Sequence, residues 1–360
     1  MIAGLTLAAA IIFMVGSVQP VQAQLAPTKS VIQTVGPGEK FASLSDAAAM
    51  QNPANSYTIN MDPGTYLDEF AVFNAPTVIN GIGVTIMTDT APPNLKGVLT
   101  TIFPLTVNGI SFIGTPYLSD NSLGSGISLA NGANSSAIRE QSNGVNTLSL
   151  NGVTIENFQM GVLTGSNTGS TYQDVVSVIN SDFINNGFPT QSANPGAFGH
   201  AIYVGDAASL VVTGTMVCGQ QVGHDVKSRA AQTTVTGSTL FVGTNTGAPT
   251  GCNPGSTSLA IDMPNGGVGL ADKNNIFQGA NNQNGSLIRY GEEGVVFTKN
   301  SLSVTRTLFD NINAPPTTIG IDELTNCIAP VSGISTDTFT NLTLSVNPPT
   351  CIAKQHGKHH

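Results

Sequence analysis

Side chains able to do chemistry gather in one third of the chain, in five short polar phrases. These phrases occupy residues 199–203, 223–230, 261–267, 274–279 and 287–294. They combine imidazole, ammonium, guanidinium, phenol and carboxyl groups, while the rest of the chain is poor in charge. The candidate site residues are His200, Tyr203, His224, Lys227, Arg229, Asp262, Asn265, Asn274, Arg289, Tyr290, Glu292 and Glu293.

This combination of residue types suits an acidic polysaccharide. Breaking a uronate chain by β-elimination needs a cation to neutralise the sugar carboxylate, a base to take the C5 proton and an acid for the leaving oxygen. Lysine, arginine, histidine and tyrosine supply all three functions. We therefore predict catalytic roles for Lys227, Arg229, His224, His200 and Tyr203, and substrate contacts from Asp262, Asn265, Asn274, Arg289, Tyr290, Glu292 and Glu293.

Two other functions fit the same residues. Hydrolysis of a glycosidic bond needs two carboxyl groups roughly 5 to 9.5 Å apart, and Asp262 with Glu292 or Glu293 is the candidate pair. A non-catalytic protein would use the same surface to bind a glycan, or would be a structural surface protein, without turnover. The product distinguishes them, since β-elimination yields an unsaturated uronate and hydrolysis a new reducing end.

The same side chains also have a purely structural interpretation. Lys227 and Arg229 can pair with Asp225 or Glu293 in surface salt bridges, which are worth under about 1 kcal/mol. The gathering of these residue types in five short phrases within one third of the chain argues against this interpretation for all of them together. Charged residues elsewhere are expected at the surface, among them Arg139, Glu140, Asp310, Asp322 and Glu323.

A repeating framework must position these phrases. From Val35 onward the chain repeats a short apolar strand, an Asn or Gly, a second short strand and a polar turn. Because alternate strand side chains point inward, stacked copies bury a column of Leu, Val, Ile and Phe, which predicts an all-β parallel solenoid. Equivalent residues of successive coils stand about 4.8 Å apart, so several phrases can form one patch. Five clear copies occupy residues 105–112, 148–155, 176–183, 210–216 and 233–240, and fainter ones lie near 269–277 and 295–302.

The start of the repeat has its own signature. Residues 35–49 predict a strand, a turn and a short helix with Phe41, Leu44 and Ala48 on one face, and Asp62-Pro-Gly-Thr-Tyr66 follows. A helix over the first coil would cover an unpaired sheet edge. This segment resembles the N-terminal cap of right-handed parallel β-helix proteins of the pectin-lyase-like superfamily. Together with the repeat, the resemblance implies a single-stranded right-handed parallel β-helix with a short N-terminal capping helix.

A second, partial resemblance bears on activity. Residues 225–228, Asp-Val-Lys-Ser, are similar to a lysine-bearing coil of β-helical alginate and chondroitin lyases. In that family the lysine is the base and an arginine one coil on is the acid, which implies Lys227 as the base. The next coil here holds Asp262-Met-Pro-Asn-Gly-Gly instead, so Arg229 or Arg289 would take the arginine's role. The whole set is closer to exported bacterial β-helix repeat proteins without an assigned reaction.

Composition narrows the class of partner. The chain of 360 residues has 12 Lys and Arg against 21 Asp and Glu, a formal net charge of −9. Nucleic-acid binding is carried mainly by clustered basic residues, so the predicted partner is an acidic polysaccharide and not a nucleic acid.

No spacing of Cys or His residues in the sequence is typical of a zinc site. We predict no metal site and no cofactor, with calcium left open, and the oligomeric state stays open too.

The N-terminal segment indicates export. Residues 1–23 are uncharged, largely apolar and end in Val-Gln-Ala, which is typical of a signal peptide. The predicted location is therefore secreted or periplasmic, without membrane contact after cleavage.

The repeat fades before Pro315-Pro316, so we predict a β-helix over residues 34–313 and a C-terminal cap and tail over residues 314–360.

Four cysteines allow three pairings. We prefer Cys218 with Cys252 and Cys327 with Cys351, because each pair would close a loop rich in Gly, Pro and Asn. Buried free thiols are the alternative.

Overall fold

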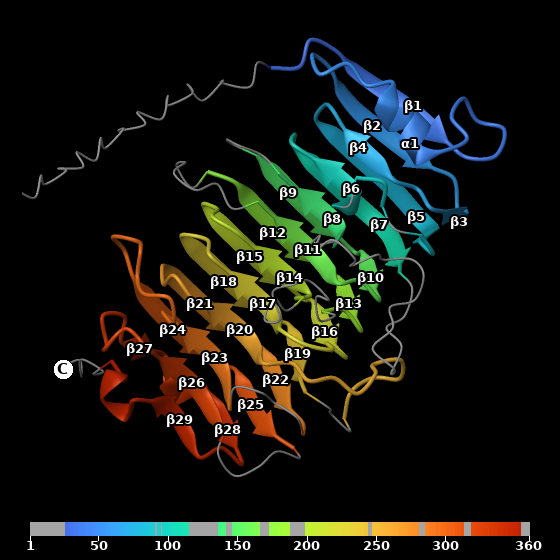
Figure 1. Cartoon of the computed structure of the whole chain (residues 1–360). Helices are drawn as coiled ribbons and strands as arrows, with labels where there is room; N and C mark the ends of the chain where they lie inside the picture. Colours follow the sequence, from blue (N-terminus) through green and yellow to red (C-terminus); the bar gives the residue numbers. More distant parts are fainter. Residues whose placement is uncertain are drawn as a thin grey trace, which may run out of the picture.

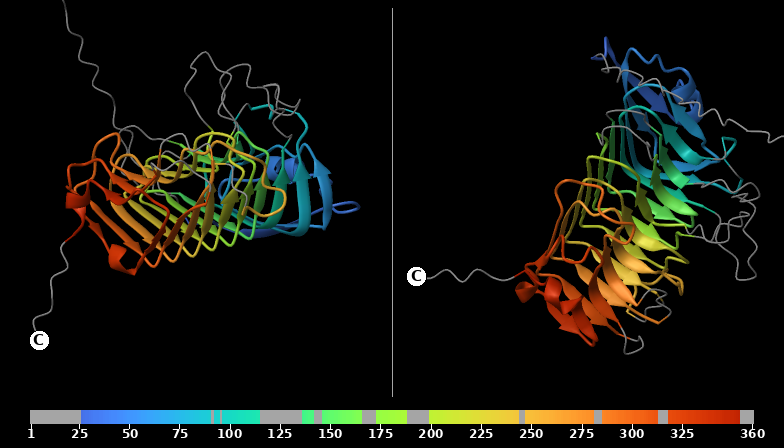
Figure 2. Two further views of the ribbon diagram at one scale, coloured as in Figure 1. Left: turned by 90° about the horizontal axis from the view of Figure 1, so that it is seen from below. Right: turned by 60° about the vertical axis from the view of Figure 1, so that its left-hand side comes forward.

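The computed structural model describes residues 26–353, except 91, 95, 115–135, 142–145, 166–172, 188–198, 244–246, 281–284 and 313–317. The chain forms an elongated column, with the N-terminal strands at one end and the C-terminal strands at the other (Figures 1 and 2). The fold is nearly all β, and its two sheets consist of stacked parallel strands. This architecture is consistent with a β-helix or solenoid. The predicted signal peptide and the tail at residues 354–360 lie outside the described residues.

One wall of the column is a ten-stranded parallel sheet, and it carries most of the candidate site. Its strands, in spatial order, are β4 (Ala71–Phe73), β6 (Gly97–Thr101), β8 (Ser136–Glu140), β11 (Met160–Thr164), β14 (Ile202–Val204), β17 (His224–Ser228), β20 (Leu259–Met263), β23 (Ser286–Tyr290), β26 (Ile319–Glu323) and β29 (Leu344–Asn347).

The other wall is a nineteen-stranded sheet made of two stacks, which β5 and β7 join. The first stack is β1 (Ser30–Val35), β2 (Ser56–Met61), β5 (Thr77–Met87), β7 (Leu105–Ile113), β9 (Thr147–Asn151), β12 (Val175–Ile179), β15 (Ser209–Thr213), β18 (Gln232–Thr236), β21 (Val268–Asp272), β24 (Ser301–Thr305) and β27 (Val331–Ser332). The second stack is β3 (Gly64–Leu67), β10 (Thr154–Glu156), β13 (Asp182–Ile184), β16 (Met216–Cys218), β19 (Thr239–Val242), β22 (Asn275–Gln278), β25 (Leu308–Asn311) and β28 (Thr338–Thr340).

Rows of aliphatic side chains fill the column and fix the register of both walls. In the ten-stranded sheet Ile202, Val226, Ile261, Ile288 and Ile321 are consecutive register partners, and all are buried in the core. A slip by one residue toward the C-terminus would replace this row by Tyr203, Lys227, Asp262, Arg289 and Asp322, so the hydrophobic pattern disfavours that register. Each coil stabilises its neighbours mainly through these rows.

Four of the five clear sequence copies form the expected pairs of strands, whereas residues 105–112 lie within the single strand β7. Leu105 is paired directly with Leu148 although 43 residues separate them, so this long interval contains no additional coil. The fainter copy near residues 269–277 corresponds to β21 and β22. The one placed at residues 295–302 is wrong, because residues 295–300 form no strand and β24 starts at Ser301.

The helix expected near the N-terminus is α1 (Leu44–Ala49), which packs on β4 and β1. Ser43 is its N-cap, and the Ser43 hydroxyl accepts a hydrogen bond from the backbone N–H of Asp46 at 3.0 Å. Leu44 and Ala48 are buried together with Ala47. The amphipathic pattern therefore identified the buried face correctly.

The parallel pairing continues beyond the boundary expected at residue 313. Strands β26, β27, β28 and β29 extend the same two sheets. Pro315 and Pro316, where the boundary was expected, lie outside the described residues, and the parallel pairing resumes after them with β26.

Both preferred cysteine pairs form disulfides, and no described cysteine is free. Two disulfides are compatible with an extracellular or periplasmic protein. No helix within the described ranges is long and apolar enough to span a membrane.

Candidate functional site

A row of polar side chains runs along the outer surface of the ten-stranded sheet. Lys227 is the register partner of Tyr203 on one side and of Asp262 on the other, and Asp262 is paired in turn with Arg289. Side chains alternate along a strand, and the neighbouring Val226 is in the core. We call the whole set the outer row; its members are Tyr203, Lys227, Asp262, Arg289, Asp322 and Asn347.

Charges alternate along the outer row. Lys227 Nζ lies 3.2 Å from Asp262 Oδ2, and Arg289 Nε lies 3.6 Å from Asp322 Oδ2. The Asn347 amide donates to Asp322 Oδ1 at 2.9 Å. The predicted contact residues Asp262 and Arg289 therefore belong to two neighbouring groups of polar contacts, Lys227 with Asp262 and Arg289 with Asp322 and Asn347, which together span five strands. Because each cation has an anionic neighbour, the outer row largely neutralises itself.

Arg229 lies one position beyond β17, on the same side of the chain as Lys227. Its guanidinium contacts Glu293, with Nη2 2.5 Å from Oε1, and its Nε donates to Asn265 Oδ1 at 3.1 Å. Lys227 Nζ lies 3.9 Å from the same carboxylate. The two cations predicted to share a side thus converge on Glu293, and Asn265 completes the contact.

The Tyr203 ring lies beside both cations. Lys227 Nζ is 5.9 Å and Arg229 Cζ is 5.4 Å from the ring centroid. Cations at this distance from an aromatic face gain about 0.5–1 kcal/mol at exposed sites. The ring therefore helps to position two of the predicted catalytic side chains.

His200 and His224 stack on one another behind this cluster. Their ring centroids are 4.9 Å apart, and the backbone N–H of His224 donates to His200 Nδ1 at 3.0 Å. Since His200 Nδ1 accepts, its proton must be on Nε2. The approach is so close that a Cβ on Gly223 would lie 1.9 Å from the Gly199 carbonyl oxygen. The packing of adjacent coils therefore requires glycine at position 223.

Both histidines are neutral at pH 7. Burial lowers the pKa of His200 well below its usual value, and the nearby charges of Lys227 and Arg229 act in the same direction. Burial and Lys227 lower the pKa of His224 to about 3. His224 Nε2 lies 3.4 Å from Asp262 Oδ2. A neutral His224 that carries its proton on Nε2 would therefore direct this N–H toward the carboxylate.

The two carboxyl groups near Lys227 are shifted in opposite directions. Burial raises the pKa of Asp262 to about 6, although Lys227 opposes the shift. Burial acts the same way on Glu293, but hydrogen bonds from Arg229 outweigh it and lower the pKa of Glu293. Opposed shifts are typical of an acid and base pair. The Asp262 side chain is fully buried, however, so it cannot reach a glycosidic oxygen in this arrangement.

Two predicted contact residues lie away from the site. Tyr290 follows Arg289 directly on β23, so it points to the opposite side; it is fully buried and its hydroxyl donates to the Gly267 carbonyl at 2.6 Å. Asn274 is buried in the other wall, where its amide donates to the Val235 carbonyl and its Oδ1 accepts from Ser238 N–H. Neither residue is accessible to a ligand, and both bridge adjacent coils instead.

Glu292 lies at the edge of the site. Its carboxylate is 3.1 Å from Arg289 Nη1, and its side chain is 47% exposed. It thus pairs with a different cation from Glu293, although the two residues are adjacent.

Several charged residues that the sequence indicated as surface are buried. Asp322 belongs to the outer row, and Glu323 is 1% exposed and accepts from the backbone N–H of Cys327 at 2.8 Å. Glu140 is also buried, and it accepts from the Asn146 amide at 2.9 Å.

Asp225, which the structural interpretation of the sequence paired with Lys227 or Arg229, lies elsewhere. It is fully buried, and neither of its carboxylate oxygens has a hydrogen-bond partner among the described residues. It therefore does not pair with Lys227 or Arg229, and burial raises its pKa well above the usual value.

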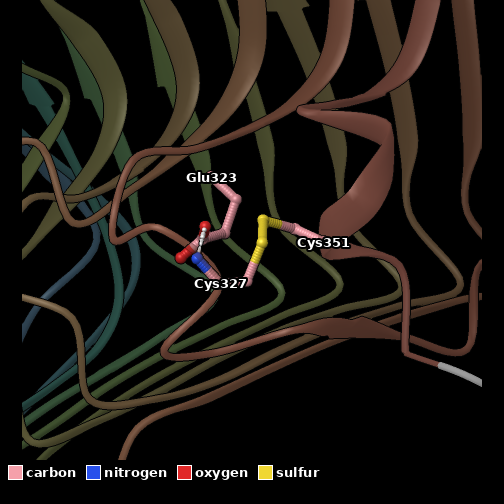
Figure 3. A group of neighbouring side chains, drawn as sticks. All are labelled: Glu323, Cys327 and Cys351. Atoms are coloured by element: carbon pink, nitrogen blue, oxygen red, sulfur yellow. Dashed lines mark hydrogen bonds between the residues drawn. A yellow bond between two sulfur atoms is a disulfide. The ribbon is translucent and has the colours of Figure 1, made fainter.

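Glu323, Cys327 and Cys351 are grouped closely enough to suggest a metal site (Figure 3). The two cysteines form a disulfide, so their sulfur atoms are not available as thiolate ligands. This group is a stapled turn, in which Glu323 accepts hydrogen bonds from Cys327 N–H and Thr325.

No protein-family model matches the chain, and the search of curated proteins found no match either. The site must therefore be interpreted from its own geometry. That geometry combines two partly exposed cations, an aromatic ring and an exposed carboxylate on one outer surface.

Proposed function

We propose that the protein is an exported right-handed parallel β-helix protein of the pectin-lyase type that binds an acidic polysaccharide along the outer row. The observation that supports this best is the convergence of Lys227 and Arg229 beside the Tyr203 ring. Ammonium and guanidinium groups bind carboxylates, and an aromatic ring offers an apolar face to a sugar.

The direction of the outer row fits an extended chain. Its members come from neighbouring strands about 4.8 Å apart, so successive sugar units of a polymer would meet successive coils. Lys227 and Arg229 have side chains that are 14% and 19% exposed, so both are partly accessible. A ligand carboxylate would replace Glu293 as the partner of Arg229, and this exchange costs little because the Glu293 side chain is 44% exposed.

Binding can be tested with polygalacturonate, alginate and hyaluronan, and with dextran as a neutral control, by calorimetry at low ionic strength. We expect Lys227→Gln and Arg229→Gln to weaken binding of an acidic glycan by about tenfold, which corresponds to about 1.4 kcal/mol. Arg306→Gln is the matched control, because Arg306 pairs with Asp272 on the other wall. Absence of binding to every acidic glycan, or an equal loss in the control variant, would refute the proposal.

Cleavage of the bound glycan by β-elimination is the second candidate. It is favoured by Lys227, Arg229 and Tyr203 lying within one cluster. Arg229 would neutralise the uronate carboxylate and Lys227 would take the C5 proton. The C4–O bond would break as the C4–C5 double bond forms, and Tyr203 would protonate the leaving oxygen.

This reaction has a structural requirement. Lys227 is paired with Asp262 as an ammonium ion, so it would have to give up a proton and leave that carboxylate before it could accept the C5 proton. Incubation with each acidic glycan should produce the ultraviolet absorbance of an unsaturated uronate, and Lys227→Ala should abolish it. Binding without absorbance would leave the non-catalytic function alone.

A further inference from the structure

We infer that Glu293 is an internal stand-in for the ligand's carboxylate: it occupies the carboxylate-binding position at Arg229, and an acidic sugar binds by displacing it. This inference rests on the proposed function, since it assigns the subsite that receives the uronate group.

The contact between Arg229 and Glu293 has the geometry of a ligand contact. One edge of the guanidinium faces the carboxylate, with Nη2 2.5 Å from Oε1 and 2.7 Å from Oε2, and Nε 3.2 Å from Oε2. Lys227 Nζ adds a second cation at 3.9 Å from Oε1. Planar, two-point recognition of this kind suits a carboxylate.

Glu293 reaches this position from a distant part of the chain. It follows β23, whereas Arg229 follows β17, two coils earlier. The backbone of the turn is held in place, because Glu293 N–H donates to the Pro264 carbonyl at 2.9 Å and Val296 N–H donates to the Asn265 carbonyl at 3.1 Å. Displacement therefore requires only rotation of the Glu293 side chain.

The exposure of Glu293 makes this exchange feasible. Its side chain is 44% exposed, whereas that of Arg229 is 19% exposed. An exposed ion pair is worth about 0.2–1 kcal/mol, so a ligand that makes additional sugar contacts can outcompete it. Rotation of Glu293 would expose Arg229, with Asn265 still accepting from its Nε.

Glu292 provides a matched control. It neighbours Glu293, is 47% exposed and forms a comparable ion pair, but its partner is Arg289. Removing either carboxylate changes the net charge equally. Only the removal of Glu293 frees the guanidinium that we assign to the ligand.

The test compares wild type, Glu293→Gln, Glu293→Ala and Glu292→Gln for binding of oligogalacturonates by calorimetry. We expect both Glu293 variants to bind about three- to fivefold more tightly than Glu292→Gln, which corresponds to loss of an internal competitor worth up to about 1 kcal/mol. Thermal unfolding confirms that the variants are folded.

The remaining outcomes separate the two proposals. Equal affinities of the Glu293 and Glu292 variants, with wild type binding, would overturn the stand-in role and leave the proposed function intact. Weaker binding by the Glu293 variants would also overturn it, because Glu293 would then contact the ligand itself. Failure of all four proteins to bind would overturn the proposed function together with this inference.

Discussion

Lys227 and Asp262 are register partners on the neighbouring strands β17 and β20, and their side chains form an ion pair 3.2 Å long on the outer surface of the column. The Asp262 side chain is fully buried beneath this contact, whereas that of Lys227 is 14% exposed. The cation therefore covers the carboxylate, and ligands meet Lys227 first.

This relationship predicts a pH-dependent effect of Asp262→Asn. Burial raises the pKa of Asp262 to about 6, so the folded protein keeps a proton that the unfolded chain releases above about pH 4. The contribution of Asp262 to the free energy of unfolding is therefore most favourable below pH 4 and falls as the pH rises to 6. Urea unfolding should therefore show the variant gaining about 2–3 kcal/mol relative to wild type between pH 4 and pH 7.

Asp272→Asn is the control for this experiment. Hydrogen bonds from Thr305 and Arg306 lower the pKa of Asp272 even though burial acts the other way. Its contribution is present at neutral pH and is lost as the pH falls, so the control should show the opposite trend. A difference between Asp262→Asn and wild type that does not change with pH would contradict the expectation.

Asp225→Ala should stabilise the protein. Asp225 aligns with Ala201 and Ala260 on the neighbouring strands, which shows that an alanine fits this layer of the core. A buried polar group without a partner costs about 1–3 kcal/mol, so we expect a gain of that order at pH 7. Burial raises the pKa of Asp225, so the gain should increase with pH. A less stable variant in urea unfolding would count against this account.

Gly223→Ala should be much more destabilising than Gly237→Ala. Both glycines have positive φ, 76° and 57°, so both alanines suffer about 1–2 kcal/mol of backbone strain. A Cβ at Gly237 meets open space, whereas one at Gly223 would be 1.9 Å from the Gly199 carbonyl oxygen. We expect an additional loss of about 2 kcal/mol or more for Gly223→Ala in thermal unfolding. Equal losses would show that the two coils separate easily.

Replacing Cys218 and Cys252 by serine should lower the free energy of unfolding by about 3–4 kcal/mol, because the disulfide closes a loop between residues 34 apart. Asn185 also ties this loop, since its amide donates to the Gly251 carbonyl and its Oδ1 accepts from Asn253 N–H. Urea unfolding of the variant, with and without reductant, tests the estimate. A loss below about 1 kcal/mol would contradict the estimate.

The repeating strands were predictable because their signal is local. Alternating apolar residues around an Asn or Gly recur in the five clear copies, as at residues 148–155, and the core needs the apolar residues there. The same alternation placed Lys227 and Arg229 on one side, where the structure has them converging on Glu293.

The site could be predicted only in part, because residues in different coils meet according to register. The spacing between coils varies, so a sequence offset does not show that Lys227 faces Asp262 or that Arg229 reaches Glu293. Tyr290 was wrongly grouped with its neighbour Arg289, although adjacent strand residues point to opposite sides. The alternation of side chains along a strand predicts that Tyr290 is buried when Arg289 lies on the outer surface.

The order of charges in the outer row also restricts how this chain could evolve in length. Lys227, Asp262, Arg289 and Asp322 succeed one another as plus, minus, plus, minus. Deleting the single coil that carries Asp262 would bring two cations face to face, whereas deleting two adjacent coils would restore the alternation. Duplication or deletion of an even number of coils in this segment should therefore be tolerated better than that of an odd number. This restriction comes from the charges on the outer surface and not from the core.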